Sequence, residues 1–223
     1  MASPLGAILF DLDGTLLDTA PDMVGALNLL LRERDLPPLP FASARPFVSH
    51  GSARLVRAGF PDADPPTFAE LQKRYLEIYG GTLSLETRLF DGMPQVLTAL
   101  AERGLLCGVV TNKPAWLTDP LLDQLGLTPS FACVVSGDTC GRSKPDPMPM
   151  LHAATLAGVT ADECVYVGDA ERDIQAAHAA GMQGLVAAYG YLGPDEDWHA
   201  WGGDGVISTP GELLPWLEHS GRL

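Results

Sequence analysis

Short apolar runs alternate with amphipathic stretches along most of the chain, and this alternation predicts strands connected by helices. The first run, 7–10, is followed directly by polar residues and a Gly-Thr pair, so it reads as a buried strand that ends in a turn. Beyond residue 90 we predict strands over 105–110, 131–136, 164–167 and 184–187, and helices over 94–103, 115–124, 148–157 and 172–180. Such alternation is typical of an α/β fold with a doubly wound, Rossmann-like parallel sheet.

Between residues 17 and 82 the pattern changes and predicts helices only. Apolar residues recur at helical spacing over 21–32, and again over 67–79. At the start of the second stretch, Thr67 and Glu70 have the spacing of a capping box. We therefore predict two domains: an α/β core over residues 1–16 and 83–223, and an inserted helical domain over residues 17–82.

Composition narrows the class of protein. The 223 residues are 46% hydrophobic with a mean hydropathy of +0.10, which is typical of a globular chain. The formal net charge of −14 opposes binding to nucleic acid or to an anionic membrane. No apolar stretch reaches the ~18 residues that a membrane-spanning helix needs. The N-terminus has no pattern of an export signal, so we expect a cytoplasmic protein.

Two carboxylates follow the first predicted strand. Asp11 and Asp13 are two positions apart, so their side chains should leave the strand on the same side. Carboxylates held this close repel, and each raises the pKa of the other unless a cation lies between them. A hard cation that prefers oxygen ligands, such as Mg²⁺, is the natural partner.

Further polar motifs follow other predicted strands. In isolation each has an ordinary structural explanation: a turn at a strand exit, a solvated lysine, or an acidic residue at a helix N-terminus. Their order along the chain favours a single site, because the carboxyl ends of parallel strands meet at one edge of the sheet. The residues concerned are Thr111, Asn112, Lys144, Asp169 and Asp173.

Together these motifs resemble those of the haloacid dehalogenase (HAD) superfamily over essentially the whole chain. Asp-Leu-Asp-Gly-Thr at 11–15 is similar to motif I, Thr-Asn at 111–112 to motif II, Ser-Lys-Pro at 143–145 to motif III, and Gly-Asp-x-x-x-Asp at 168–173 to motif IV. The resemblance implies the HAD fold with a helical C1-type cap, formed by the inserted domain. It also implies Mg²⁺-dependent hydrolysis of phosphomonoesters through an aspartyl-phosphate.

The resemblance also implies a role for each motif residue. Asp11 would be the nucleophile, and Asp13 would protonate the leaving group and then activate water. Asp11, the backbone carbonyl of Asp13, and Asp169 would bind Mg²⁺, while Asp173 would orient water or Lys144. The phosphoryl group would be held by three residues: Thr111, the amide of Asn112, and Lys144.

The substrate is less determined. The cap and the segments 89–94, 110–114 and 189–191 are similar to the phosphoglycolate phosphatase group, whereas Trp-Gly-Gly-Asp at 201–204 favours related bacterial phosphatases of N-acetylmuramic acid 6-phosphate. Both substrates carry a carboxylate, so a cap loop rich in donors suits either. Candidates for such a loop are Arg45, Ser49, His50 and Gly51, although a solvated loop position explains His50 equally well.

Several alternatives stay open. A phosphatase of another sugar phosphate, or a phosphomutase, could use the same core and cap, and a substrate-binding protein is the non-enzymatic alternative. Dehalogenation is disfavoured because haloacid dehalogenases proper lack a carboxylate at the position of Asp13. A P-type ATPase is disfavoured by the absence of apolar spans. We expect a small phosphorylated metabolite as partner, and either a monomer or a homodimer.

Overall fold

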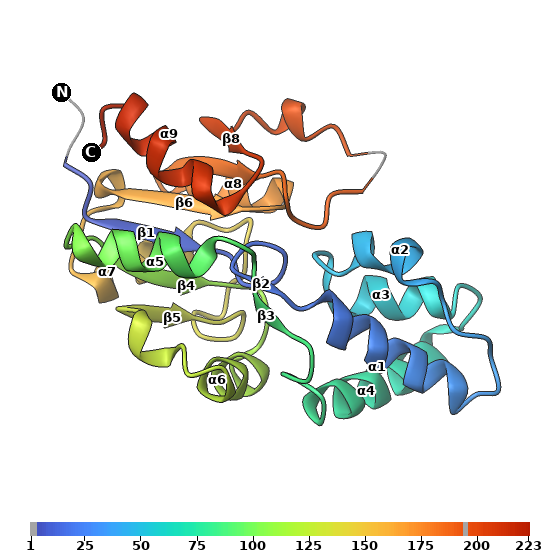
Figure 1. The fold of residues 1–223 in the computed structure, drawn as a ribbon. Coiled ribbons are helices and arrows are strands. Elements are labelled where there is room, and N and C mark those ends of the chain that lie inside the picture. The colour runs from blue at the N-terminus through green and yellow to red at the C-terminus, as the bar shows by residue number, and fades with distance from the viewer. Residues whose placement is uncertain (1–3, 194–195) are drawn as a thin grey trace.

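Six parallel strands form the central sheet of the computed structural model, which describes residues 4–193 and 196–223. Their order across the sheet is β5-β4-β1-β6-β7-β8 (Figure 1). The chain adds β4 and β5 on one side of β1 and β6, β7 and β8 on the other, so the direction of winding reverses at β1. The strands are β1 (Ala7–Phe10), β4 (Leu106–Val110), β5 (Cys133–Val135), β6 (Cys164–Gly168), β7 (Gln183–Ala187) and β8 (Gly205–Ile207).

Helices cover both faces of this sheet, and the alternation of side chains along β1 explains why. Ile8 and Phe10 pack into the hydrophobic cluster under α5, α6 and α9, whereas Ala7 and Leu9 pack into a second cluster under α7 and α8. A strand buried on both faces must be apolar throughout, as β1 is. The helices are α5 (Met93–Glu102), α6 (Ala115–Gln124), α7 (Met148–Ala157), α8 (Glu171–Ala179) and α9 (Leu213–His219). The predicted fold class is confirmed.

Helices α1 to α4 form a separate lobe beside the sheet (Figure 1). In this lobe α1 packs against α3 and α4. Asp64 begins α4 by accepting a hydrogen bond from the Thr67 N–H at 2.9 Å, so the predicted capping box of Thr67 and Glu70 is wrong. The acidic residue three positions earlier takes the N-cap position. The bounds are α1 (Ala20–Arg32), α2 (Phe41–Ala44), α3 (Gly51–Gly59) and α4 (Pro65–Gly80).

The chain enters and leaves this lobe through a two-stranded antiparallel ribbon of β2 (Leu17–Asp18) and β3 (Arg88–Leu89). The buried carboxylate of Asp22 accepts hydrogen bonds from the N–H groups of Glu86 and Thr87 and from the Thr87 hydroxyl. The segment 17–82 is thus not helical throughout, because it includes β2. The division into two domains at these residues stays a prediction.

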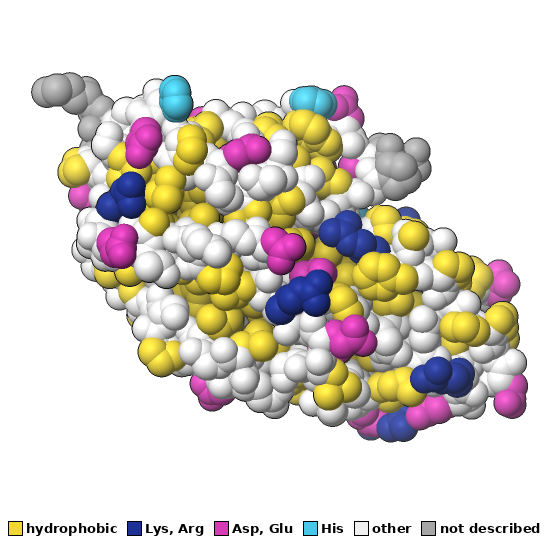
Figure 2. Space-filling view, viewed as in Figure 1, with side chains coloured by type: hydrophobic (Ala, Val, Ile, Leu, Met, Phe, Trp, Pro, Cys, Tyr) yellow, Lys and Arg dark blue, Asp and Glu magenta, His cyan; other side chains and the backbone are white. Residues whose placement is uncertain are grey.

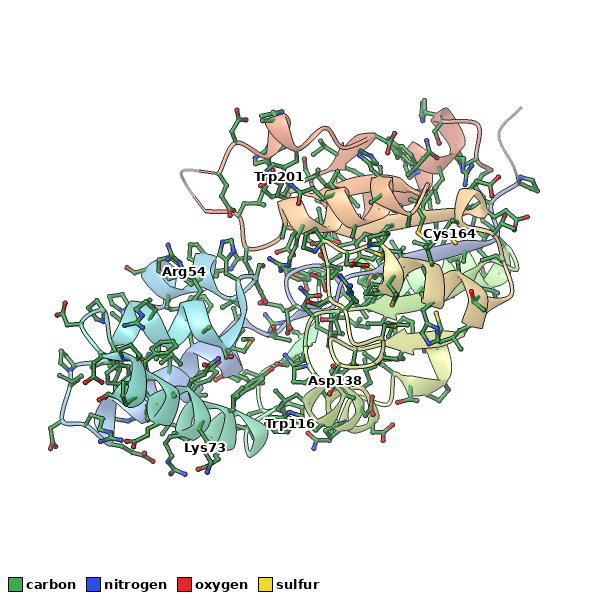
Figure 3. All side chains as sticks on the ribbon, turned by 180° about the vertical axis from the view of Figure 1, so that it is seen from behind. Arg54, Lys73, Trp116, Asp138, Cys164 and Trp201 are labelled. Carbon is green, nitrogen blue, oxygen red and sulfur yellow. The ribbon has the colours of Figure 1, made fainter. Side chains whose placement is uncertain are left out.

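The lobe also contacts the core at the start of α6. Trp116, labelled in Figure 3, lies against Gly80 at the end of α4. In the described parts of the chain, no helix combines the length and apolar character that crossing a membrane requires.

Candidate active site

A cavity of about 340 Å³ lies between the carboxyl edge of the sheet and the helical lobe. In Figure 2 Lys, Arg, Asp and Glu side chains gather where the core and the helical lobe are in contact. Asp11, Thr111 and Asp169 directly follow β1, β4 and β6, three adjacent strands at the point where the winding reverses. The core contributes Asp11, Asp13, Thr111, Asn112, Lys113 and Arg172 to the cavity wall, and the lobe contributes Ser49, His50, Gly51, Tyr75 and Tyr79 among others.

The Lys144 ammonium is buried behind Asp11. Its Nζ lies 2.9 Å from Asp11 Oδ1 and 2.8 Å from Asp173 Oδ1, and it also donates to the Val110 carbonyl and the Tyr166 hydroxyl. The fully buried ammonium is thus surrounded by four oxygen atoms of the protein. In this structure Lys144 therefore compensates two carboxylates and does not line the cavity itself.

Asn112 fixes the backbone of that lysine. Its side-chain amide donates to the Lys144 carbonyl at 2.9 Å and accepts from the Lys144 N–H at 2.9 Å. Thr111 lies in the cavity wall, where its hydroxyl accepts a hydrogen bond from the Lys113 N–H at 3.1 Å. Both residues of the predicted motif II thus line the cavity, as Asp11 does, and Asn112 also fixes the backbone of Lys144.

Asp13 points to partners other than those of Asp11. The Lys113 ammonium contacts both of its carboxylate oxygens, at 2.8 and 3.0 Å, and the Thr19 hydroxyl donates to it at 2.7 Å. Lys113 also lies over the Tyr79 ring, 4.8 Å from its centroid. Sequence reasoning missed both Lys113 and Thr19. The available signal for Lys113 was its place directly after Thr111 and Asn112, before a proline that restricts its backbone.

Three buried carboxylates lie together, and one of them, Asp11, lines the cavity. One oxygen each from Asp11, Asp169 and Asp173 lies within 4.8 Å of the other two. Burial, with the charges of Asp11 and Asp173, raises the pKa of Asp169 to about 7. Burial also raises the pKa of Asp173, although Lys144 opposes that rise. Three buried acids with one lysine between them make a site where a divalent cation would relieve repulsion, and the all-oxygen donor set fits Mg²⁺.

This cluster differs in one respect from the expected ligand set. Asp173, expected to orient water or Lys144, is the third carboxylate of the cluster, within 4.8 Å of the other two. The expected ligand from Asp13 is its backbone carbonyl, and the Asp13 side chain pairs with Lys113. Asp169 is further held by the Ser49 hydroxyl at 2.6 Å and the Tyr191 N–H at 2.9 Å, both donating to Oδ2. The Thr15 hydroxyl donates to its other oxygen at 3.3 Å.

The four cap-loop candidates separate in the structure. Ser49 reaches Asp169, while His50 and Gly51 lie in the cavity wall. His50 Nε2 lies 3.1 Å from a carboxylate oxygen of Glu196, which follows β7 in the core. Arg45 is not in the wall: its guanidinium donates to the Gly190 carbonyl and lies 4.6 Å from the centroid of the Tyr191 ring. Arg45 therefore joins the lobe to the core.

A family model of haloacid dehalogenase-like hydrolases matches residues 8–187. The chain belongs to this family. A relative called phosphoglycolate phosphatase, from Xanthomonas campestris, is 44% identical over 93% of this chain and 94% of that protein. Another, called N-acetylmuramic acid 6-phosphate phosphatase, from Pseudomonas aeruginosa, is 36% identical over 97% of this chain and 96% of that protein. The crystal structure of a predicted phosphoglycolate phosphatase from Haemophilus somnus superposes with a TM-score of 0.85 at 26% identity, covering 96% of this chain and 98% of that one.

Arg172 is a second cavity residue of this hydrolase that sequence reasoning missed. It stands between Asp169 and Asp173 in the first turn of α8, and its guanidinium donates to the Ser49 carbonyl in the lobe. Burial alone would lower the pKa of Arg172, but the carboxylates of Asp173, Asp11 and Asp169 outweigh it and raise that pKa. The side chain therefore stays cationic. Its place inside motif IV was the only sequence signal for it.

Proposed function

We propose that this hydrolase is a Mg²⁺-dependent phosphomonoesterase that acts on small phosphorylated carboxylic acids, with phosphoglycolate as the first candidate. The observation that carries the proposal is the position of Asp11. Its carboxylate lies in the cavity wall, within the cluster of three acids and next to Thr111. Relatives called phosphoglycolate phosphatase support this substrate. N-acetylmuramic acid 6-phosphate is the second candidate, supported by relatives with that name.

The reaction begins with attack of an Asp11 carboxylate oxygen on phosphorus. The ester P–O bond breaks, and the leaving oxygen takes a proton from Asp13. Water then attacks the phosphorus of the Asp11 phosphate, losing its proton to Asp13, which frees inorganic phosphate and restores Asp11. Mg²⁺, held by Asp11, Asp169 and Asp173, would neutralise charge on the phosphoryl oxygens.

Contacts within the protein position the residues that carry out these steps. Thr111 is positioned to donate its hydroxyl to the phosphoryl group. Lys144 holds one oxygen of the Asp11 carboxylate, and Asp11 lines the cavity. Lys113 and Thr19 fix the position of the Asp13 carboxylate, which is the acid–base group of both steps. Before it can protonate a leaving group, Asp13 must first take up a proton and loosen its contact with Lys113.

The size of the cavity supports a small substrate. A volume of about 340 Å³ is near the lower end for ligand sites, which span roughly 300–1,000 Å³. The lobe covers the phosphoryl site from above with His50, Tyr75 and Tyr79. A phosphorylated metabolite fits such a space, whereas a phosphoprotein or a nucleic acid does not.

The test compares kcat/KM for phosphoglycolate, N-acetylmuramic acid 6-phosphate and glucose 6-phosphate, with Mg²⁺ and after removal of metal by EDTA. We expect one of the two acids to be preferred, and activity to require Mg²⁺. Undiminished turnover without metal would contradict the proposal. Release of inorganic phosphate in step with loss of substrate distinguishes a phosphatase from a phosphomutase, and absence of turnover on every ester would favour a binding protein.

A further inference from the structure

Arg172 presents an unused set of hydrogen-bond donors to the cavity. A guanidinium carries five N–H donors in a planar fork. Among the described residues, the Ser49 carbonyl is the one acceptor that the Arg172 side chain contacts. The contact holds one edge of the fork against the cap loop, and the residue lines the cavity. The remaining donors are thus oriented before any ligand arrives.

Arg172 makes no direct ion pair among the described residues, in contrast to the two lysines nearby. Lys113 is paired with Asp13, and Lys144 with Asp11 and Asp173. No carboxylate oxygen of the described residues lies within 4.0 Å of the Arg172 guanidinium. Among Lys113, Lys144 and Arg172 in the described part of the chain, Arg172 is the one that could bind an anion without breaking a direct ion pair.

We propose that Arg172 binds the carboxylate of the substrate and so selects phosphorylated acids over neutral phosphoesters. The inference rests on the proposed function and adds the residue that determines the substrate class. Arginine suits the task because its fork can donate two parallel hydrogen bonds to one carboxylate. Arg172 lies three residues after Asp169, so a carboxylate at its guanidinium would belong to a ligand whose phosphate is at the three-acid cluster.

Matched substrate pairs test this directly. Phosphoglycolate is compared with 2-hydroxyethyl phosphate, in which a hydroxymethyl group replaces the carboxylate. N-acetylmuramic acid 6-phosphate is compared with N-acetylglucosamine 6-phosphate, which lacks the carboxylate-bearing lactyl group. In Arg172→Gln we expect kcat/KM to fall about 10- to 100-fold for the preferred acid and less than about 3-fold for its neutral analogue. Arg172→Lys keeps the positive charge but not the planar set of donors. Its kcat/KM should fall by an intermediate factor for the acid and stay unchanged for the neutral analogue.

Arg54→Gln is the matched control. Arg54 lies on α3 in the lobe, where it is exposed and its guanidinium is 5.6 Å from the Phe47 ring centroid (Figure 3). Its substitution should change neither member of a pair. If Arg172→Gln lowers kcat/KM equally for acid and neutral substrate, Arg172 only ties the cap loop to the core, and the inference is overturned while the proposed function stands.

A binding measurement separates this inference from the proposed function. Phosphoglycolate and 2-hydroxyethyl phosphate are titrated calorimetrically into Asp11→Asn and into Asp11→Asn/Arg172→Gln, both with Mg²⁺. We expect the additional substitution to weaken binding of the acid about 10- to 100-fold and to leave the neutral ester within about 3-fold. This pattern in a protein that hydrolyses no phosphoester would refute the proposed function and support the inference. Equal weakening of both ligands would refute the inference.

Discussion

Replacing Lys144 with methionine should destabilise the protein far more than an ordinary surface charge does. Methionine keeps much of the side-chain length but removes the ammonium that contacts Asp11 and Asp173. The side chains of Lys144 and Asp173 are 0% exposed and that of Asp11 is 5% exposed, so the two acids would lose their compensating charge without gaining water. Removing one partner of a buried ion pair typically costs about 3–5 kcal/mol of the free energy of unfolding. For a chain of this size that corresponds to a fall in Tm of roughly 6–20 °C.

The assay is urea and thermal unfolding of metal-free protein at pH 7.5. Arg142→Met is the control, because the Arg142–Asp146 pair lies in the same loop as Lys144 and its arginine side chain is 66% exposed. We expect Arg142→Met to lower the free energy of unfolding by less than about 1 kcal/mol. The double variant Lys144→Met/Asp173→Asn should regain part of the lost free energy of unfolding, because it removes one of the two carboxylates left without a cationic partner.

The loss of stability caused by Lys144→Met should also depend on pH, in a direction that follows from the pKa of Asp173. In the native state the pKa of Asp173 is already raised by burial, and without Lys144 it should rise further. Between its unfolded and its native pKa, the folded state holds a proton that the unfolded chain has released, so stability falls as pH rises. The cost of Lys144→Met should therefore be smaller at pH 5 than at pH 7.5. A cost below about 1 kcal/mol at pH 7.5, or one equal to that of Arg142→Met, would refute the reasoning.

Three further predictions follow from the site. Asp11→Asn should retain the fold by circular dichroism and lose turnover on every phosphoester; appreciable activity would refute its assignment as the nucleophile. Because the pKa of Asp169 is raised to about 7, metal-free protein should lose free energy of unfolding as pH rises from 5 to 8. Mg²⁺ should restore stability at pH 8, and in Asp169→Asn the slope measured by urea unfolding should flatten; an unchanged slope would contradict this cause. His50→Ala should raise KM or change substrate preference. Unaltered kinetics would show that His50 does not contact the substrate and only pairs with Glu196.

The sheet and the position of the site could be predicted because they depend on local pattern. Each core strand is a short apolar run, and in a parallel sheet all carboxyl ends lie at one edge. Asp11, Thr111 and Asp169 therefore meet even though more than a hundred and fifty residues separate the first from the last. Their convergence needs the order of the strands, which the motifs themselves imply, and no knowledge of any side-chain conformation.

The partners within the site could not be predicted in this way. The pairing of the Asp13 side chain with Lys113 depends on side-chain rotation after the end of β1, and no periodicity encodes that. Arg45 has the chemistry of a substrate-binding residue, but the loop after β7 supplies both a carbonyl and an aromatic ring for it. These contacts join residues about 145 positions apart, and they exist only after the lobe and the core have come together.

That loop makes the geometry of the acid cluster dependent on the position of the lobe. Tyr191 donates its backbone N–H to Asp169, while its hydroxyl accepts from the Ala20 N–H and donates to Asp18, at the point where the chain enters the lobe. Its ring lies under Arg45. Ser49 adds a second link, since its hydroxyl and its carbonyl contact Asp169 and Arg172 respectively. A displacement of the lobe must therefore break or stretch hydrogen bonds to Asp169. The arrangement of lobe and core that places the lobe residues at the cavity thus also fixes the Asp169 carboxylate.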